Sequence, residues 1–240
     1  MHADKPTVVI LCGGRGTRLQ ERGSSLPKPL VEIGGRPILW HVINIYLSQG
    51  FRRFLLLTGY RGAQIEAFVT GESWSRDAQI TCMATGADTP TGGRLHRAAA
   101  TLQDERFCLA YADGVADIDL GALLAYHGEH GGAATMAVVQ PELPFGVARL
   151  NGDATVRGFT EKPRSDLWVN AGFFCFERSA LALLEPDSVL ERGPLERLAA
   201  AGQLRAFHHE GFWECMDTYK DAIMLNDLWA EGRAPWKLWE

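Results

Sequence analysis

The sequence predicts an α/β protein whose central sheet is covered by helices on both faces. Two observations lead to this prediction: apolar runs typical of strands alternate with helical patterns through the first half, and shorter strands dominate the second half. Strands separated by helices of such length are parallel and joined by right-handed crossovers. With 240 residues, of which 46% are hydrophobic, the chain can bury a substantial core, and we interpret it as one domain.

The expected elements of the first half alternate regularly. Strands are expected at residues 7–12, 51–60, 78–84 and 106–114, and helices at residues 37–50, 61–69, 92–102 and 120–130. In the expected helix at residues 37–50, Trp40, His41 and Tyr46 should pack in the core, because they lie on its apolar stripe.

The second half is richer in short expected strands, which Gly, Pro and Asn residues separate. Shorter strands are expected at residues 134–142, 145–163 and 168–177, extending the same sheet. A hairpin is expected near residues 150–155, where Asn-Gly-Asp favours a tight turn. Two helical pieces interrupted by Pro194 and a last helix closed by Gly232 complete the chain, and its terminal tryptophans are expected to hold the C-terminus against the body or a neighbouring subunit.

The composition excludes some partners. The net charge of −5 argues against nucleic acid and against an anionic membrane, since both favour a basic surface. Five cysteines without a CxxC pair fit neither a disulfide framework nor a zinc site, which indicates a reducing compartment. The apolar runs are too short for a signal peptide or a membrane span. We therefore expect a cytoplasmic protein that acts on small molecules.

A glycine-rich loop follows the first expected strand, in the stretch LCGGRGTRLQERGSSLPKPL. Glycines in such a turn bring backbone N–H groups close to a phosphate. Thr17-Arg18 stands where a P-loop needs Lys-Ser or Lys-Thr, and Leu19 stands where a dinucleotide fingerprint needs its third glycine. The cations Arg15, Arg18 and Lys28 instead suit a triphosphate. The alternative is a solvated loop with incidental basic residues, although long loops without a function are uncommon.

Acidic residues and histidines offer candidate metal ligands. Asp113 directly follows an expected buried strand, which is where ligands bind in open α/β sheets. Asp117 and Asp119 could join it in a cluster, but we expect one of them to cap the following helix. His127 and His130 lie at i and i+3 without a third ligand nearby, so a solvated helix face is expected there.

Several motifs in the same order resemble the sugar-1-phosphate nucleotidylyltransferases. The likeness is carried by GGRGTRL, PKPLVEIGGRPILWHVI, TGGRLHR, YADGVADIDL, FTEKP, NAGFFCF, GFWECMDT and APWKLWE, and it covers nearly the whole chain. Within that family the chain most resembles the branch that joins CTP to glucose 1-phosphate. The resemblance implies a Rossmann-like three-layer fold with a mixed, mostly parallel sheet, a Mg²⁺ ion and a homo-oligomer.

The resemblance also implies roles for individual residues. Residues 1–132 would form a nucleotide-binding half and residues 133–240 a sugar-phosphate-binding half. The nucleotide would be held by Leu11, Gly13, Gly14, Gly16, Thr17, Gly92, Gly93 and Arg94. The sugar phosphate would contact Gly146, Glu161, Asn170 and Gly172. The catalytic cations would be Arg18, Lys28 and Lys162, and the metal ligands Asp113 and Asp217.

The chain departs from that branch at three places. Leu26 replaces a basic residue, residues 68–90 form a shorter segment, and Cys215 replaces a proline. We interpret the cysteine as neutral, whereas the shorter segment bears on base choice and subunit contacts. Apart from the resemblance, Glu161 and Lys162 could equally belong to a surface turn.

The leading hypothesis is Mg²⁺-dependent transfer of a nucleotidyl group from a nucleoside triphosphate, expected to be CTP, to a sugar 1-phosphate, expected to be glucose 1-phosphate. No general base is needed, because a phosphate monoester with its second pKa near ~6 is largely dianionic at neutral pH. Three alternatives remain open: the same reaction with GTP or UTP and another acceptor, a non-catalytic regulatory protein that binds sugar nucleotides, and a glycosyltransferase that uses Asp117 and Asp119 as its DxD motif.

Overall fold

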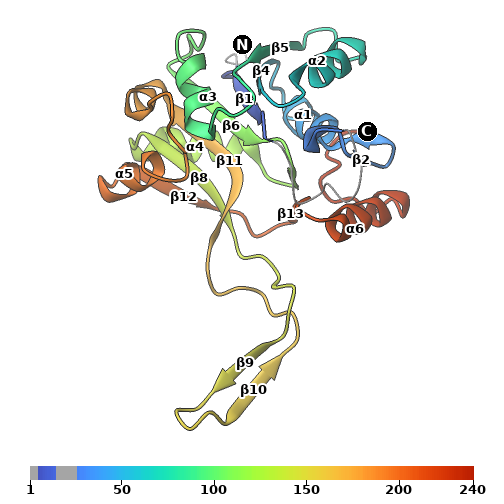
Figure 1. The fold of residues 1–240 in the computed structure, drawn as a ribbon, viewed down its shortest axis with the longest axis vertical. Coiled ribbons are helices and arrows are strands. Elements are labelled where there is room, and N and C mark those ends of the chain that lie inside the picture. Colours follow the sequence, from blue (N-terminus) through green and yellow to red (C-terminus); the bar gives the residue numbers. More distant parts are fainter. Residues whose placement is uncertain (1–4, 15–25) are drawn as a thin grey trace.

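The computed structural model describes residues 5–14 and 26–240, and its centre is a mixed sheet (Figure 1). Within these residues the sheet has seven strands, in the order β12 (Leu204–His208), β8 (Ala134–Val139), β11 (Val169–Glu177), β6 (Arg106–Tyr111), β1 (Val8–Cys12), β4 (Arg53–Thr58) and β5 (Gln79–Ala84). Neighbouring strands are parallel except around β11, which is antiparallel to β6 and β8. The expected mixed, mostly parallel sheet is confirmed.

Helices cover both faces of this sheet. They are α1 (Ile38–Ser48), α2 (Gly62–Gly71), α3 (Thr91–Ala98), α4 (Leu120–His130), α5 (Pro194–Ala200) and α6 (Tyr219–Ala230), with short 3₁₀ turns η1 (Lys28–Leu30) and η2 (Arg178–Leu183). Alternation along β1 divides the core, since Val8 and Ile10 face the layer that includes α1, α2, α4 and α6, while Val9 faces the layer that includes α3 and α5. The three-layer prediction is therefore confirmed.

Small strand pairs complete the described structure. They are β2 (Glu32–Ile33) with β3 (Arg36–Pro37), β7 (Gly114–Ala116) with β13 (Trp213–Cys215), and β9 (Val147–Leu150) with β10 (Val156–Thr160). The β7 and β13 pair matters for function, because it brings the chain after β6 together with a segment about a hundred residues later.

The arm, residues 140–168, projects from the body (Figure 1). It carries the expected hairpin, and at its turn the Asn151 N–H donates to the Thr155 carbonyl. Its two legs are tied together, since the Leu143 N–H donates to the Pro163 carbonyl and the Ser165 N–H to the Pro141 carbonyl. The expectation that all strands of the second half extend the central sheet was wrong for this segment. β9 and β10 pair only with each other, so the arm leaves the sheet.

The C-terminus is fixed to the body through tryptophan, as predicted. Trp236 is completely buried, and its indole N–H donates to Nδ1 of the buried His41. His41 Nε2 in turn donates to the Ile33 carbonyl, which fixes the neutral tautomer. Burial lowers the pKa of His41 to about 4. His41 and Tyr46 are core residues, as expected from the apolar stripe of α1.

Two expectations about helices need correction. His127 does not lie on a solvated face: it is buried under α4, with Nδ1 2.7 Å from Thr135 Oγ1 and Nε2 3.2 Å from Glu177. The polar partners on β8 and β11 allow a histidine to be buried there. The first expected helical piece of residues 181–204 is only the 3₁₀ turn η2, and Pro194 begins α5 instead of interrupting a helix.

Candidate active site

A cavity of about 380 Å³ opens at the carboxyl ends of β1 and β6. Its lining comes from the turn after β1, from η1, from the segment before α3, from the end of β6 and from Glu191. Because β1 and β6 are parallel neighbours, the residues that follow both strands meet at the same edge of the sheet. This is the usual position of a ligand site in an open α/β sheet.

The glycine turn forms one wall of this cavity. Leu11, Gly13 and Gly14 line it, as expected for residues that hold a nucleotide. A Cβ on Gly13 would lie 1.9 Å from the Arg94 guanidinium carbon, so a larger residue there would displace the Arg94 side chain. The predictions for Gly16, Thr17 and Arg18 fall outside the described residues.

Arg94 braces the loops around the cavity. Its buried guanidinium donates to the carbonyls of Gly13, Thr58 and Gly86 at 2.9–3.0 Å, and to Thr85 Oγ1 at 2.6 Å. These bonds join the turn after β1 to the segments after β4 and β5. Arg94 lines the cavity, but the hydrogen bonds that the structure gives it are with carbonyls and one hydroxyl group of the protein itself.

Gly92 and Gly93 serve close packing between α3 and a later loop. A Cβ on Gly93 would lie 2.2 Å from the Pro186 carbonyl oxygen, and one on Gly92 would lie 2.8 Å from Ser188. Among the described residues that line the cavity, the nearby contributions come from residues 89–91 and from Arg94. Contact of these two glycines with a base thus stays a prediction.

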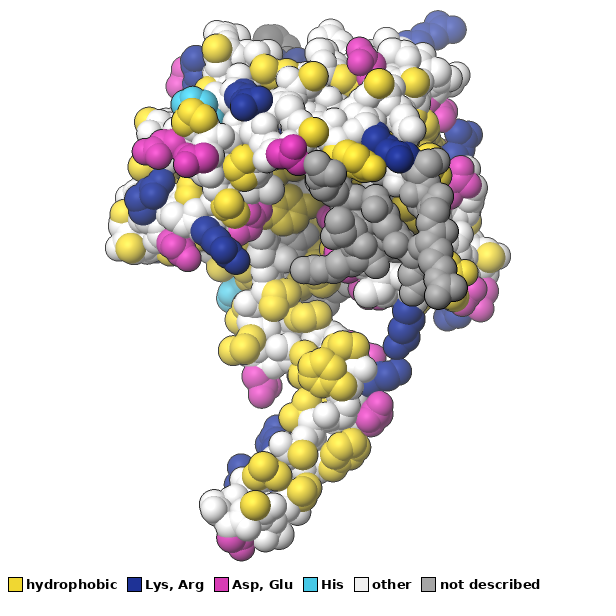
Figure 2. Space-filling view, in the orientation of Figure 1, with side chains coloured by type: hydrophobic (Ala, Val, Ile, Leu, Met, Phe, Trp, Pro, Cys, Tyr) yellow, Lys and Arg dark blue, Asp and Glu magenta, His cyan; other side chains and the backbone are white. Residues whose placement is uncertain are grey.

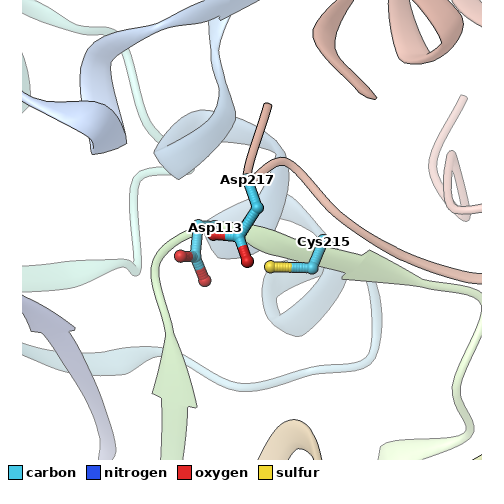
Figure 3. Close-up of side chains that lie close together, drawn as sticks. All are labelled: Asp113, Cys215 and Asp217. Carbon is cyan, nitrogen blue, oxygen red and sulfur yellow. The ribbon is translucent and has the colours of Figure 1, made fainter. Parts of the chain in front are cut away.

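The two expected metal ligands are brought together by the β7 and β13 pair. Asp113 lies between β6 and β7, and Asp217 follows β13, where the Met216 N–H donates to the Asp113 carbonyl at 2.9 Å. Figure 3 shows both carboxylates close to the thiol of Cys215. Carboxylates from segments far apart in the chain therefore lie together beside the cavity, which Asp113 lines.

Lys28 holds a positive charge between these carboxylates. Its Nζ lies 2.6 Å from Asp113 Oδ2 and also bonds Asp217 Oδ1. The flanking Pro27 and Pro29 fix the backbone around η1 and so direct the lysine inward. Burial alone would lower the pKa of Lys28, but the two carboxylates outweigh it and raise the pKa. The paired oxygens fit a hard divalent cation, since their present partner is itself a cation.

A hydrogen-bonded network that includes Thr91, Tyr111 and Glu191 forms another part of the cavity lining. Tyr111 Oη donates to one carboxylate oxygen of Glu191 at 2.5 Å, and Thr91 Oγ1 donates to the other at 2.7 Å. Asn170 Nδ2 donates to Tyr111 Oη at 3.2 Å, and its Oδ1 accepts from the Gly172 N–H. Burial, with the Glu191 charge, raises the pKa of Tyr111. Asn170 and Gly172 thus reach the cavity wall through Tyr111.

Tyr111, Thr91 and Glu191 were missed by sequence reasoning. Tyr111 could have been found, because it lies two positions before Asp113 and therefore shares its side of the strand end. Glu191 carries no such signal: it lies between η2 and α5, in a segment without regular periodicity.

The remaining sugar-phosphate candidates lie on the arm. Gly146 is packed against Phe159 and Glu161, and both Glu161 and Lys162 are exposed. Lys162 has a left-handed backbone, with φ of 44°. Within the part of the chain that the structure describes, no arm residue lines the cavity. Asn170 and Gly172 therefore lie behind Tyr111, which lines the cavity, whereas Gly146, Glu161 and Lys162 lie on the arm and away from the cavity lining.

The two aspartates of the DxD alternative have structural partners. Asp119 caps α4, accepting from the Ala122 N–H, as the sequence predicted. Asp117 lies 3.0 Å from Nε2 of His209. Neither belongs to the described acidic cluster of Asp113 and Asp217.

A glycine turn after the first strand, with one carboxylate after the parallel neighbour β6 and a second one after β13 beside it, is typical of α/β enzymes that bind phosphorylated ligands at the edge of the sheet. The comparisons with known proteins narrow this class. Residues 7–214 match the model of the nucleotidyl transferase family, and the chain belongs to that family.

Relatives that match the chain over nearly its full length are nucleotidyltransferases as well. The chain is 39% identical to a glucose-1-phosphate cytidylyltransferase of Salmonella typhimurium, over 97% of this chain and 99% of the relative. It is 38% identical to a probable glucose-1-phosphate cytidylyltransferase of Bacillus subtilis, over 96% and 99%. The resemblance predicted from the motifs is confirmed, and the chain is a sugar-1-phosphate nucleotidyltransferase.

Solved structures confirm the fold. HddC from Yersinia pseudotuberculosis superimposes with a TM-score of 0.75, covering 94% of this chain and all of that chain, at 20% identity. In the described residues, no helix has the length and apolar character needed to cross a bilayer.

Proposed function

We propose that the protein transfers a cytidylyl group from CTP to glucose 1-phosphate in a Mg²⁺-dependent reaction that releases pyrophosphate. The observation that supports this most is the pair of carboxylates with the Lys28 ammonium between them, at a cavity that Lys28, Asp113 and the glycine turn line. The CTP and glucose assignments rest on the names of the full-length relatives.

The chain's own groups would position the substrates and, together with Mg²⁺, stabilise charge. Backbone N–H groups of the Gly13-Gly14 turn would bind the triphosphate, and Asp113 with Asp217 would hold Mg²⁺. Bound there, the ion would neutralise charge on the reacting phosphates. Lys28, released from the carboxylates, would then be available to the leaving pyrophosphate. The acceptor phosphate attacks the α-phosphorus in line, and no side chain has to remove a proton from it.

A substrate panel tests this proposal. Pyrophosphate release is measured with CTP, UTP, GTP, ATP and dTTP, each against glucose 1-phosphate and other sugar 1-phosphates, with and without Mg²⁺. We expect turnover only with CTP, glucose 1-phosphate and Mg²⁺ together. Turnover with GTP or UTP and another acceptor would establish the second candidate instead, and a protein that binds these ligands without turnover would be the regulatory alternative.

Aspartate variants separate the active-site assignment from the DxD alternative. Asp113→Asn should abolish turnover, whereas Asp119→Asn, which alters only a helix cap, should retain it. The opposite result would contradict the site assigned at the cavity.

We also propose that the protein is a homo-oligomer and that the arm of one copy completes the site of another. The arm exposes large apolar side chains that a monomer leaves in water: Phe145 is 60%, Phe159 66% and Leu167 75% exposed. Figure 2 shows apolar side chains gathered along the arm. Such a surface is typical of an interface. Because Lys162 lies on this arm and outside its own cavity, association offers it a route to a partner's sugar phosphate.

A further inference from the structure

A thiol lies beside the two expected metal ligands. Cys215 is the last residue of β13, and its Sγ lies with a carboxylate oxygen of Asp113 and one of Asp217 in a group whose atoms are all within 4.8 Å of one another. In Figure 3 the sulfur points toward the carboxylates. This placement makes the Cys215 sulfur a candidate ligand beside the two carboxylates.

The same place already attracts a cation. The Lys28 ammonium bonds both carboxylates, so the field of Asp113 and Asp217 selects positive charge between them. Antiparallel pairing of Cys215 with Gly114 holds the thiol next to the residue that follows Asp113. The sulfur is therefore fixed on the rim of a cation site by the backbone register and does not depend on a flexible loop.

The three potential ligands combine one soft sulfur donor, the Cys215 thiol, with two hard oxygen donors, the carboxylates of Asp113 and Asp217. Mg²⁺ takes oxygen ligands, and a thiol adds nothing to its binding. Zinc-like ions take thiolate and carboxylate together, at about 2.3 Å for sulfur and about 2.0–2.2 Å for oxygen. Tetrahedral ligands at those lengths are about 3.5 Å apart, so the observed group needs to contract by only about 1 Å. Three protein ligands with a fourth position open is a common zinc arrangement.

We propose that Cys215, Asp113 and Asp217 form a binding site for a thiophilic divalent cation of the Zn²⁺, Co²⁺ and Cd²⁺ class. The Lys28 ammonium moves out of the site when such an ion enters, and the Cys215 thiol releases its proton to water as the metal–sulfur bond forms. Because these ions bind such ligands more tightly than Mg²⁺ does, they would displace Mg²⁺ and inhibit nucleotidyl transfer. The inference goes beyond the proposed function, since it concerns an ion that this reaction does not use.

Cobalt spectroscopy of the whole protein tests the site without any turnover. Co²⁺ is added to the purified protein without nucleotide, and the sulfur-to-cobalt charge-transfer absorption is recorded. We expect this band in the unaltered protein and in Cys82→Ala, a matched change of another half-buried strand cysteine. We expect the band to be lost in both Cys215→Ala and Cys215→Ser, with circular dichroism confirming that each variant is folded.

Zinc titration gives the second measurement. Zn²⁺ should remove the cobalt band, and calorimetry should show Zn²⁺ affinity falling at least about tenfold in Cys215→Ala, because losing a direct ligand costs no less than losing an outer hydrogen-bond partner. A missing cobalt band in the unaltered protein, a band that survives in Cys215→Ala, or unchanged Zn²⁺ affinity would overturn the inference. None of these outcomes depends on whether CTP is the substrate, which the substrate panel decides separately.

Discussion

The cavity and the arm differ in their side-chain contacts: charged groups around the cavity have hydrogen-bond or ion-pair partners, whereas charged and apolar side chains on the arm are exposed. Around the cavity each described charged group has partners: Arg94 has several carbonyls, Lys28 two carboxylates and Glu191 two hydroxyl groups. On the arm, Lys162 and Phe159 both lie exposed. The difference teaches that the body is complete as a fold while the expected site is divided between the body and the arm. Substitutions in the two regions should therefore fail in different ways.

The largest effect is expected from Arg94→Leu in the body. This change removes one hydrogen-bond donor from each of the carbonyls of Gly13, Thr58 and Gly86, and the loss of these hydrogen bonds to a buried charged group costs about 3–5 kcal/mol. Urea unfolding measures the loss. Arg157→Leu on the arm is the matched control, since that arginine is exposed and should leave stability within about 0.5 kcal/mol. Equal losses in the two variants would contradict the comparison.

Lys162→Ala should show the opposite behaviour. We expect turnover to fall roughly a few hundredfold. This fall corresponds to a loss of about 3–4 kcal/mol of transition-state stabilisation, by analogy with the loss of one preorganised charge-stabilising group. The melting temperature should not change, because the side chain is exposed and alanine meets the same left-handed backbone. Arg157→Leu again controls for loss of positive charge on the arm. Normal turnover in Lys162→Ala would show that Lys162 on the arm does not contribute to catalysis.

Acid should lower the free energy of unfolding because His127 is buried in its neutral form. Burial, with Arg106 nearby, lowers the pKa of His127 to about 4, against an effect of Glu177 that raises it. An unfolded chain binds this proton near pH ~6.5, so it holds more protons than the folded chain between pH ~6.5 and ~4, and stability falls as the pH falls through that window. We expect a contribution of about 1–2 kcal/mol.

Unfolding of His127→Gln at several pH values measures this contribution. The variant should lose less stability than the parent between pH 7 and pH ~4. The groups that face the ring are Thr135, His130, Glu177 and Arg106, and the charges on the last three contribute to the His127 pKa. A parallel decline of the two curves would contradict the buried neutral histidine.

The smallest effect on stability is expected from Phe159→Ser. The side chain is 66% exposed, so the free energy of unfolding of a subunit should change by no more than about 0.5 kcal/mol. Sedimentation should nevertheless show a shift toward smaller species, because an exposed aromatic residue on the arm would be an interface anchor. An unchanged association state would exclude this face of the arm as the interface.

Much of the fold follows from local patterns that the sequence displays. The alternation of residues 7–130 predicted β1, β4, β5 and β6 with their helices, because buried parallel strands and amphipathic helices leave different periodicities. The edge strand β12 and the short strand β13 were missed. Both are half-exposed, and β13 is defined by its register with β7 and not by its own composition.

The site was predictable in part for a similar reason. Asp113 and Gly13 follow strands and could be placed at the sheet edge from the sequence. Asp217 came from the resemblance, and Glu191 was not found, because both reach the cavity through long-range contacts that no local pattern records. The distance of Lys162 from its own cavity could not be foreseen, since a hairpin pattern does not tell whether the hairpin joins the sheet or leaves it.

The divided site is tested most directly by subunit complementation. Asp113→Asn and Lys162→Ala chains, each inactive alone, are co-expressed with different tags, and the doubly tagged assembly is assayed for pyrophosphate release from CTP and glucose 1-phosphate. If the arm acts on a partner, some sites in the mixed assembly combine an intact Asp113 with an intact Lys162, and turnover returns. A mixed assembly as inactive as its parents would contradict the account.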